Sequence, residues 1–184
     1  MNYVYHGSSV PDLKLIKKHK STRMKEWVYA CYSKAISIVF ISKDGSDLFF
    51  SLSGNGKNYP VELVERKPGM FKTIFNCSGY IYKLDASNFK ENQTGWSAEV
   101  VSDKDEKVVS SEYIENIYDE LIKLDKEGLI KLYLYPNRPD YVPIDNSDLI
   151  PKVLRWYKNG YDVNNFYNIY PELKDIFIEV SKKG

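Results

Sequence analysis

Short runs of β-favouring residues, each closed by a turn signal, recur along this sequence and limit the folds open to it. Residues 48–52, 59–64 and 79–84 are such runs, and glycine, proline or asparagine follows each of them within a few positions. Further runs cover residues 2–6, 27–30, 96–102, 108–109 and 129–135. Because only a few helical patterns lie between the runs, their order predicts an α+β fold with a mainly antiparallel sheet.

Helical periodicity adds a small number of helices to this sheet. The clearest covers 112–125, starts beside serines at 110 and 111, and stops at Gly128. Ser33 is expected to cap a helix that begins at Lys34 and places Ile36, Val39 and Phe40 on one face. Residues 70–75 fit either a helix or a strand.

Two weaker helices, 149–158 and 172–180, are expected near the C-terminus, joined by a linker rich in tyrosine and asparagine. We therefore divide the chain into an α+β domain over residues 1–145 and a C-terminal helical extension over 146–184 that packs on it.

The composition restricts location and partners. The chain has 26 basic and 25 acidic residues, a net charge of +1, so overall charge predicts neither a nucleic-acid partner nor a membrane partner. No charged segment followed by an apolar run opens the chain, and the apolar run at 36–41 is too short to span a bilayer. With Cys31 and Cys77 read as reduced thiols, these features predict a soluble cytoplasmic protein.

Few motifs for chemistry are present. The two histidines show no zinc-ligand spacing, and neither a phosphate-binding loop nor a dinucleotide-binding glycine motif occurs. What remains is His6 at the end of a tyrosine-rich run, followed by Gly7 and Ser8. A single histidine there is ordinarily a hydrogen-bonded structural residue, but Gly7 would let a ligand approach the backbone closely.

The run Tyr5-His6-Gly7-Ser8 resembles the Tyr-His-Gly-Thr start of diphtheria-toxin-type ADP-ribosyltransferases and poly-ADP-ribose polymerases. That superfamily has a split sheet and a His, Tyr, Glu signature on three separate strands. The resemblance implies that His6 hydrogen-bonds the adenine-side ribose of NAD. It also implies two aromatic rings around the nicotinamide and a glutamate that stabilises the oxocarbenium-like transition state.

The segment from Val28 to Ala35 is similar to the second family element, a strand that leads through a serine turn into a helix. Tyr29 occupies the position of the first family tyrosine, and Phe40 that of the second. Phenylalanine retains ring stacking and lacks the hydroxyl. Tyr32 is an alternative second ring.

Glu99, in the 96–102 run, is the best match to the family's catalytic glutamate. Glu106 and Glu112 are the rivals, although Glu112 also suits a helix start. A glutamate on a strand is ordinarily just exposed to solvent.

The resemblance implies a protein that binds NAD as a substrate, without a metal, and transfers ADP-ribose to an acceptor while nicotinamide leaves. One alternative is a catalytically inactive module on the same fold that binds a nucleotide or a protein. Another is an activity like that of the RNA 2′-phosphotransferases, which resemble this superfamily. The basic residues between 17 and 25 would then contact phosphates, although a solvated loop is the simpler explanation for them.

Overall fold

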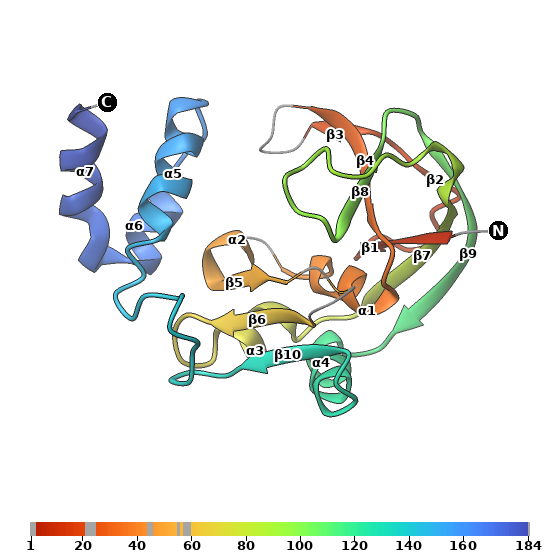
Figure 1. Ribbon diagram of the computed structural model, residues 1–184, viewed down its shortest axis with the longest axis horizontal. Coiled ribbons are helices and arrows are strands. Elements are labelled where there is room, and N and C mark those ends of the chain that lie inside the picture. The colour runs from red at the N-terminus through yellow and green to blue at the C-terminus, as the bar shows by residue number, and fades with distance from the viewer. Residues whose placement is uncertain (1–2, 21–24, 44–45, 55, 57–59, 184) are drawn as a thin grey trace.

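The computed structural model of the chain describes residues 3–20, 25–43, 46–54, 56 and 60–183. Strands in these residues form two sheets, of seven and three strands, with helices beside them (Figure 1). The larger sheet runs β2-β9-β7-β1-β4-β3, and β8 also pairs with β4. Its strands are β1 (Tyr3–Ser8), β2 (Leu15–Ile16), β3 (His19–Lys20), β4 (Glu26–Cys31), β7 (Gly79–Asp85), β8 (Glu99–Ser102) and β9 (Glu106–Ile114).

Each strand pair of the larger sheet is antiparallel. The smaller sheet contains β5 (Phe50–Ser53), β6 (Val61–Glu65) and β10 (Ile130–Tyr133), and its β6–β10 pair is parallel. The expectation of an α+β fold with a mainly antiparallel sheet is therefore confirmed.

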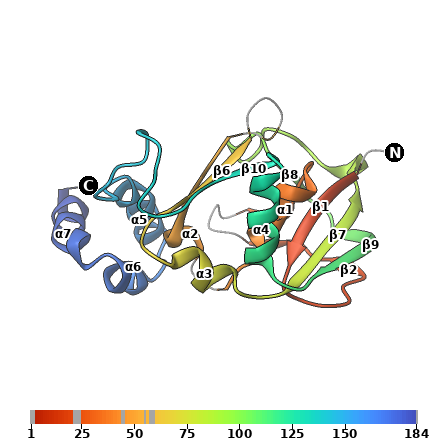
Figure 2. The same cartoon turned by 90° about the horizontal axis from the view of Figure 1, so that it is seen from below.

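The main core lies where the helices pack on the sheets. The helices here are α1 (Lys34–Ser37), α2 (Ser46–Phe49), α3 (Met70–Phe75) and α4 (Ile117–Lys126). Figure 2, a view from below, shows α4 and α1 lying across the strands. Phe71 and Phe75 of α3 and Leu121 of α4 are buried together with Leu63 of β6 and Ile81 of β7. Burial of these side chains removes their apolar surface from water, which stabilises the packing between the two sheets.

Strand β1 continues two residues beyond its predicted end. Gly7 and Ser8 do not break the strand, because Gly7 pairs with Ile81 and Ser8 with Tyr80 in β7. The prediction of a break was wrong because it weighed the turn preference of these residues without the pairing that β7 provides.

The helix that begins at Lys34 is capped as predicted, since the side chain of Ser33 accepts a hydrogen bond from the Ile36 backbone N–H at 3.4 Å. It then tightens into a 3₁₀ turn over Ile38–Phe40. Three residues per turn, in place of 3.6, change which side chains share a face. Phe40 is consequently 44% exposed, whereas Ile36 and Val39 are buried, so the predicted common face was wrong for Phe40.

The clearest predicted helix starts later than expected. Residues up to Ile114 belong to β9, and α4 begins at Ile117, where Asn116 accepts a hydrogen bond from the Asp119 backbone N–H at 3.1 Å. Glu112 is therefore a strand residue and not the first turn of a helix. Elsewhere, residues 70–75 are helical, and the run at 48–52 is divided between α2 and β5.

The C-terminal helices form a second cluster at the opposite end of the molecule from β9 (Figure 1). They are α5 (Leu149–Lys158), α6 (Asn164–Ile169) and α7 (Lys174–Lys183), so the predicted linker contains a helix of its own. Leu48 of α2 is buried within this cluster, and the Tyr170 hydroxyl donates a hydrogen bond to the Leu48 carbonyl. No helix in the described part of the chain is long and apolar enough to cross a membrane.

Candidate functional site

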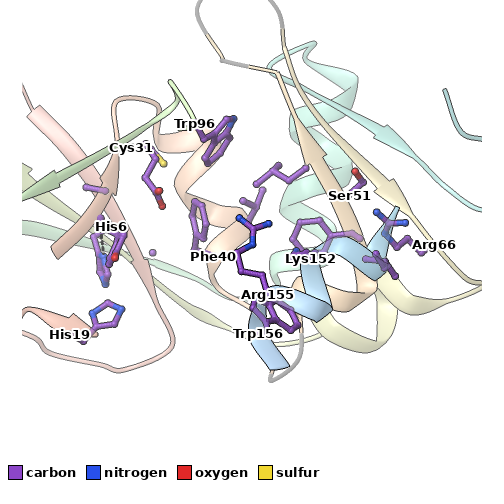
Figure 3. Close-up of a pocket in the computed structure, with 18 of the residues that line it drawn as sticks. His6, His19, Cys31, Phe40, Ser51, Arg66, Trp96, Lys152, Arg155 and Trp156 are labelled. Atoms are coloured by element: carbon purple, nitrogen blue, oxygen red, sulfur yellow. Dashed lines mark hydrogen bonds between the residues drawn. The ribbon is translucent and has the colours of Figure 1, made fainter. Parts of the chain in front are cut away.

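A cavity of about 950 Å³ lies between the larger sheet and helix α5. Figure 3 shows His6 and His19 on one side of it, Phe40 and Trp96 between, and α5 with Lys152, Arg155 and Trp156 on the other. Residues distant in the sequence are thus brought to one cleft. Outside α5, the side chains that line the cleft include Tyr5, His6, His19, Tyr29, Cys31, Val39, Phe40, Phe50, Ser51, Leu52, Arg66, Trp96 and Glu99.

The structure brings most of the predicted site residues to this cavity. His6, Gly7, Tyr29, Phe40 and Glu99 all line it. They come from β1, β4 and β8, which pair in the larger sheet, and from the 3₁₀ turn, which packs against β1.

Two predicted residues lie outside the cavity lining. Ser8 accepts a hydrogen bond from the Val10 backbone N–H at 3.2 Å, which is a local turn contact. Tyr32 packs against the cluster on the other side of the sheet that contains Val4 and Val28, and its hydroxyl interacts with Glu91. Neither is among the residues around the cleft.

His6 is held by the neighbouring strand. Its Nδ1 lies 2.7 Å from the backbone carbonyl oxygen of Tyr29. A carbonyl only accepts, so Nδ1 carries the proton and Nε2 is the acceptor of the neutral ring. Burial lowers the pKa of His6, the Tyr29 carbonyl opposes this shift, and the charge of His19 adds to it. The imidazole is therefore neutral at pH 7.

Gly7 is required by the close packing of helix α1 against β1. A Cβ placed there would lie 2.2 Å from the carbonyl oxygen of Ser37, in α1. The close backbone approach that glycine permits is thus made by the helix that leads to Phe40. Gly7 positions the 3₁₀ turn against β1.

Glu99 lies in a different environment from the two other candidate glutamates, Glu106 and Glu112. Glu99 is 8% exposed, pairs with Cys31 across β8 and β4, and lines the cavity. Glu106 accepts a hydrogen bond from the Ser102 hydroxyl at 2.5 Å, and Glu112 forms an ion pair with Lys34 at 2.5 Å. Both rivals lie on β9 outside the cavity lining.

Glu99 also affects the pKa of the neighbouring Cys31 thiol. Burial, and then the negative charge of Glu99, raise the pKa of Cys31. Cys31 is therefore a neutral thiol and is not a nucleophile at pH 7.

Aromatic rings line the cavity in two groups. Phe40 contacts Trp96 with ring centroids 6.1 Å apart, and the Trp96 indole N–H donates to the Gly54 carbonyl at 2.7 Å. Tyr29 contacts His19 at 5.4 Å. The sequence did not indicate Trp96 or His19 as site residues, because its patterns predict a strand that starts at Trp96 and a basic loop around His19.

Helix α5 supplies the remaining side of the cavity, which sequence reasoning also missed. Its residues Leu149, Lys152, Arg155 and Trp156 line the cleft, together with Asp148 directly before it and Asn159 directly after it. Positions three and four apart lie on one helix face, so this spacing was a signal available in the sequence. Arg66, itself 3% exposed, binds both carboxylate oxygens of Asp148 at 2.9 and 2.7 Å and fixes the start of α5.

Comparison of the chain with protein-family models, with curated proteins and with solved structures gives no match. No group of three His, Cys, Asp or Glu side chains within the described residues could hold a metal ion. What the cavity offers chemically is a neutral imidazole, a buried carboxyl group, several aromatic rings and cationic side chains on α5.

Proposed function

We propose that this chain is an ADP-ribosyltransferase-like protein that binds NAD in the cleft, releases nicotinamide and transfers ADP-ribose to an acceptor. The observation that supports the proposal is the meeting of His6, Tyr29, Phe40 and Glu99 around one cavity. They are the residues that the resemblance to the ADP-ribosyltransferases implies for the NAD site.

His6 is suited to bind a ribose. Nδ1 donates to the Tyr29 carbonyl, so the acceptor nitrogen Nε2 is left for a ligand hydroxyl. Because burial keeps the ring neutral, a hydroxyl can donate to it without competition from a proton.

Phe40 is suited to contact nicotinamide. It is 44% exposed, so its ring presents a face to the cavity and Trp96 supports it at 6.1 Å. An exposed aromatic ring loses little conformational entropy when it stacks on a planar ligand, since only two torsions must be fixed.

Glu99 would act on the bond that breaks. Positive charge grows on the ribose as the glycosidic C–N bond lengthens and its electron pair passes to nicotinamide. A carboxylate fixed by β8 stabilises that charge more in the transition state than in the ground state. One such group contributes about 3 kcal/mol, roughly two orders of magnitude in rate.

The deciding experiment is NAD titration by calorimetry, followed by an assay for free nicotinamide, on the wild-type protein and on Glu99→Gln. We expect Glu99→Gln to bind NAD and to lose about a hundredfold in nicotinamide release. Glu112→Gln is the matched control, because it removes an exposed carboxylate outside the cavity. Equal turnover in wild type and Glu99→Gln would refute the role of Glu99.

A second candidate is a nucleotide-binding module without catalysis on the same fold. The observation in its favour is the phenyl ring of Phe40, which lacks the hydroxyl of the family's second tyrosine. This candidate predicts that NAD raises the melting temperature while no nicotinamide is released.

A further inference from the structure

Helix α5 has one packed face and one face toward the cavity. Ile150 and Val153 are buried in the C-terminal cluster, whereas Lys152, Arg155 and Trp156 line the cleft. The cavity-lining positions are three and four apart, so they share one face of the helix. A helix outside the segments that resemble the ADP-ribosyltransferases therefore faces the proposed NAD site.

The side chain of Arg155 reaches into the cleft without a protein partner among the described residues. Its guanidinium makes no hydrogen bond, ion pair or aromatic contact with them, and the residue is exposed. Figure 3 shows this side chain extending from α5 toward Phe40. By contrast, the Lys152 ammonium lies 5.3 Å from the centroid of the Trp156 ring. Arg155 thus brings several N–H donors and a full positive charge to the cleft.

The sheet side of the cavity offers a carboxyl group and no lysine or arginine. The described residues of β1, β4, β8 and the 3₁₀ turn that line the cleft include Glu99, and their one basic side chain is His6, whose ring is neutral. Arg66 lines the cavity as well, but its guanidinium binds both carboxylate oxygens of Asp148. An anionic group in this cleft therefore needs its countercharge from α5, since an unpaired charge away from bulk water is costly.

NAD has an anionic group at the matching place. Its negatively charged diphosphate joins the adenine-side ribose, which we assign to His6, to the nicotinamide ribose, which we assign to Glu99. A ligand held at both ends has its diphosphate between them, on the stretch of the cleft toward which Arg155 extends (Figure 3). Because Arg155 is exposed, a phosphate that it binds keeps part of its hydration.

We propose that Arg155 binds the diphosphate of NAD, so that the C-terminal extension supplies part of the NAD site. This inference rests on the proposed function. The planar guanidinium can donate a pair of parallel hydrogen bonds to phosphate oxygens, a geometry that lysine lacks. Asp148 and Arg155 are separated by about 10 Å along α5. The Arg66–Asp148 contact that fixes the start of α5 therefore also positions Arg155.

The test compares ligands with and without the diphosphate on wild-type protein and on Arg155→Gln. NAD and ADP-ribose contain it, and their dissociation constants are measured by calorimetry at about 50 and about 200 mM salt. Adenosine lacks it and is followed by NMR titration at millimolar concentrations. We expect Arg155→Gln to bind NAD and ADP-ribose roughly tenfold more weakly, with a smaller salt dependence. Its affinity for adenosine should stay within about twofold of wild type.

Two further variants separate a phosphate contact from a general effect of charge. Lys126→Gln removes a cation from the last turn of α4, a helix of 10 residues like α5, outside the cavity lining. It should change the affinities less than about twofold. Arg155→Lys keeps the charge without the planar fork and should recover only part of the NAD affinity. All three variants should melt close to wild type, because both side chains are exposed.

The outcomes distinguish this inference from the proposed function. Nicotinamide release by wild-type protein, with unchanged NAD affinity in Arg155→Gln, overturns the role of Arg155 and leaves the proposed function intact. An equal loss of affinity for adenosine, or in Lys126→Gln, does the same. Arg155-dependent binding of ADP-ribose without nicotinamide release from NAD supports the diphosphate site and overturns the transfer. If neither NAD nor ADP-ribose binds wild-type protein, both are overturned.

Discussion

The imidazole Nδ1 of His6 and the backbone carbonyl oxygen of Tyr29 lie 2.7 Å apart, which joins two predicted site residues on neighbouring strands. The contact fixes the tautomer of His6 and therefore which nitrogen can accept from a ligand. It uses a backbone atom of Tyr29, whose ring contacts His19 at the cavity. One hydrogen bond thus orients the first element of the proposed NAD site.

This hydrogen bond leads to a prediction about pH. Burial lowers the pKa of His6 below the ordinary value of 6.5, so the unfolded chain takes up a proton more readily than the folded one. The neutral ring therefore contributes stability above pH 6.5, and this contribution is lost as the pH falls through the lowered pKa. The free energy of unfolding should decrease from about pH 7.5 to about pH 5.5 in urea titrations, and His6→Asn should decrease less.

His6→Asn also separates the two ring nitrogens. The asparagine amide can still donate to the Tyr29 carbonyl, but nothing replaces Nε2. We expect a stable variant that binds NAD at least tenfold more weakly, measured by calorimetry. Unchanged NAD affinity in a folded His6→Asn variant would show that Nε2 does not contact the ligand.

Gly7→Ala should destabilise the protein through a clash between the new side chain and helix α1. The new methyl group would lie 2.2 Å from the Ser37 carbonyl oxygen, which belongs to a helix and cannot move away cheaply. We expect a loss of about 2 kcal/mol or more in the free energy of unfolding, measured with denaturant. Ser8→Ala is the control, with an expected change below about 0.5 kcal/mol, since Ser8 makes an exposed turn contact.

Local patterns in the sequence predicted much of this fold. Residues 27–30 and 79–84 are strands and Ser33 caps a helix, because β-branched or aromatic runs and a serine hydroxyl act over a few residues. The end of β1 and the start of α4 could not be read in this way. Both depend on pairing with β7, a strand far away in the sequence.

The sequence predicted the residues on only one side of the cavity. His6, Tyr29, Phe40 and Glu99 occur in short motifs that resemble a known arrangement, so a sequence could suggest them. Helix α5 carried no such motif, so its cavity-lining residues were not predicted from the sequence. Its position across the cleft depends on the buried contact of Arg66 with Asp148, which joins residues 82 positions apart.

That contact should make a large difference to stability. Arg66 is 3% exposed and Asp148 is 35% exposed, with 2.7 Å between them, so loss of one partner leaves a charge poorly compensated. We expect Arg66→Met to lower the free energy of unfolding by about 2 kcal/mol. Lys90→Met is the control, because its pair with Asp103 has the same 2.7 Å distance but both side chains are exposed.

Lys90→Met should lower the free energy of unfolding, measured with denaturant, by less than about 0.5 kcal/mol. Hydrogen exchange would then show whether Arg66→Met loosens α5 specifically, as expected for a contact at its start. Equal costs for Arg66→Met and Lys90→Met would contradict the role assigned to the buried pair.

Variants of Phe40 distinguish a ring that contacts a ligand from a ring that packs in the core. Its ring is 44% exposed, whereas the ring of Phe71 is 1% exposed and contacts Phe75 at 5.7 Å. Phe40→Leu should therefore change the free energy of unfolding by less than about 0.5 kcal/mol, while Phe71→Leu should cost more than about 1 kcal/mol. Loss of ring stacking in Phe40→Leu should weaken NAD binding roughly three- to tenfold.

Phe40→Tyr completes this comparison, because it adds the hydroxyl of the family's second tyrosine to a ring that has space on its cavity side. We expect Phe40→Tyr to remain as stable as wild type in thermal melts and to bind NAD at least as tightly in calorimetry. If Phe40→Leu instead destabilises the protein as much as Phe71→Leu and leaves NAD affinity unchanged, Phe40 is a packing residue. The ring that contacts nicotinamide would then have to be sought at Trp96, its neighbour in the cleft.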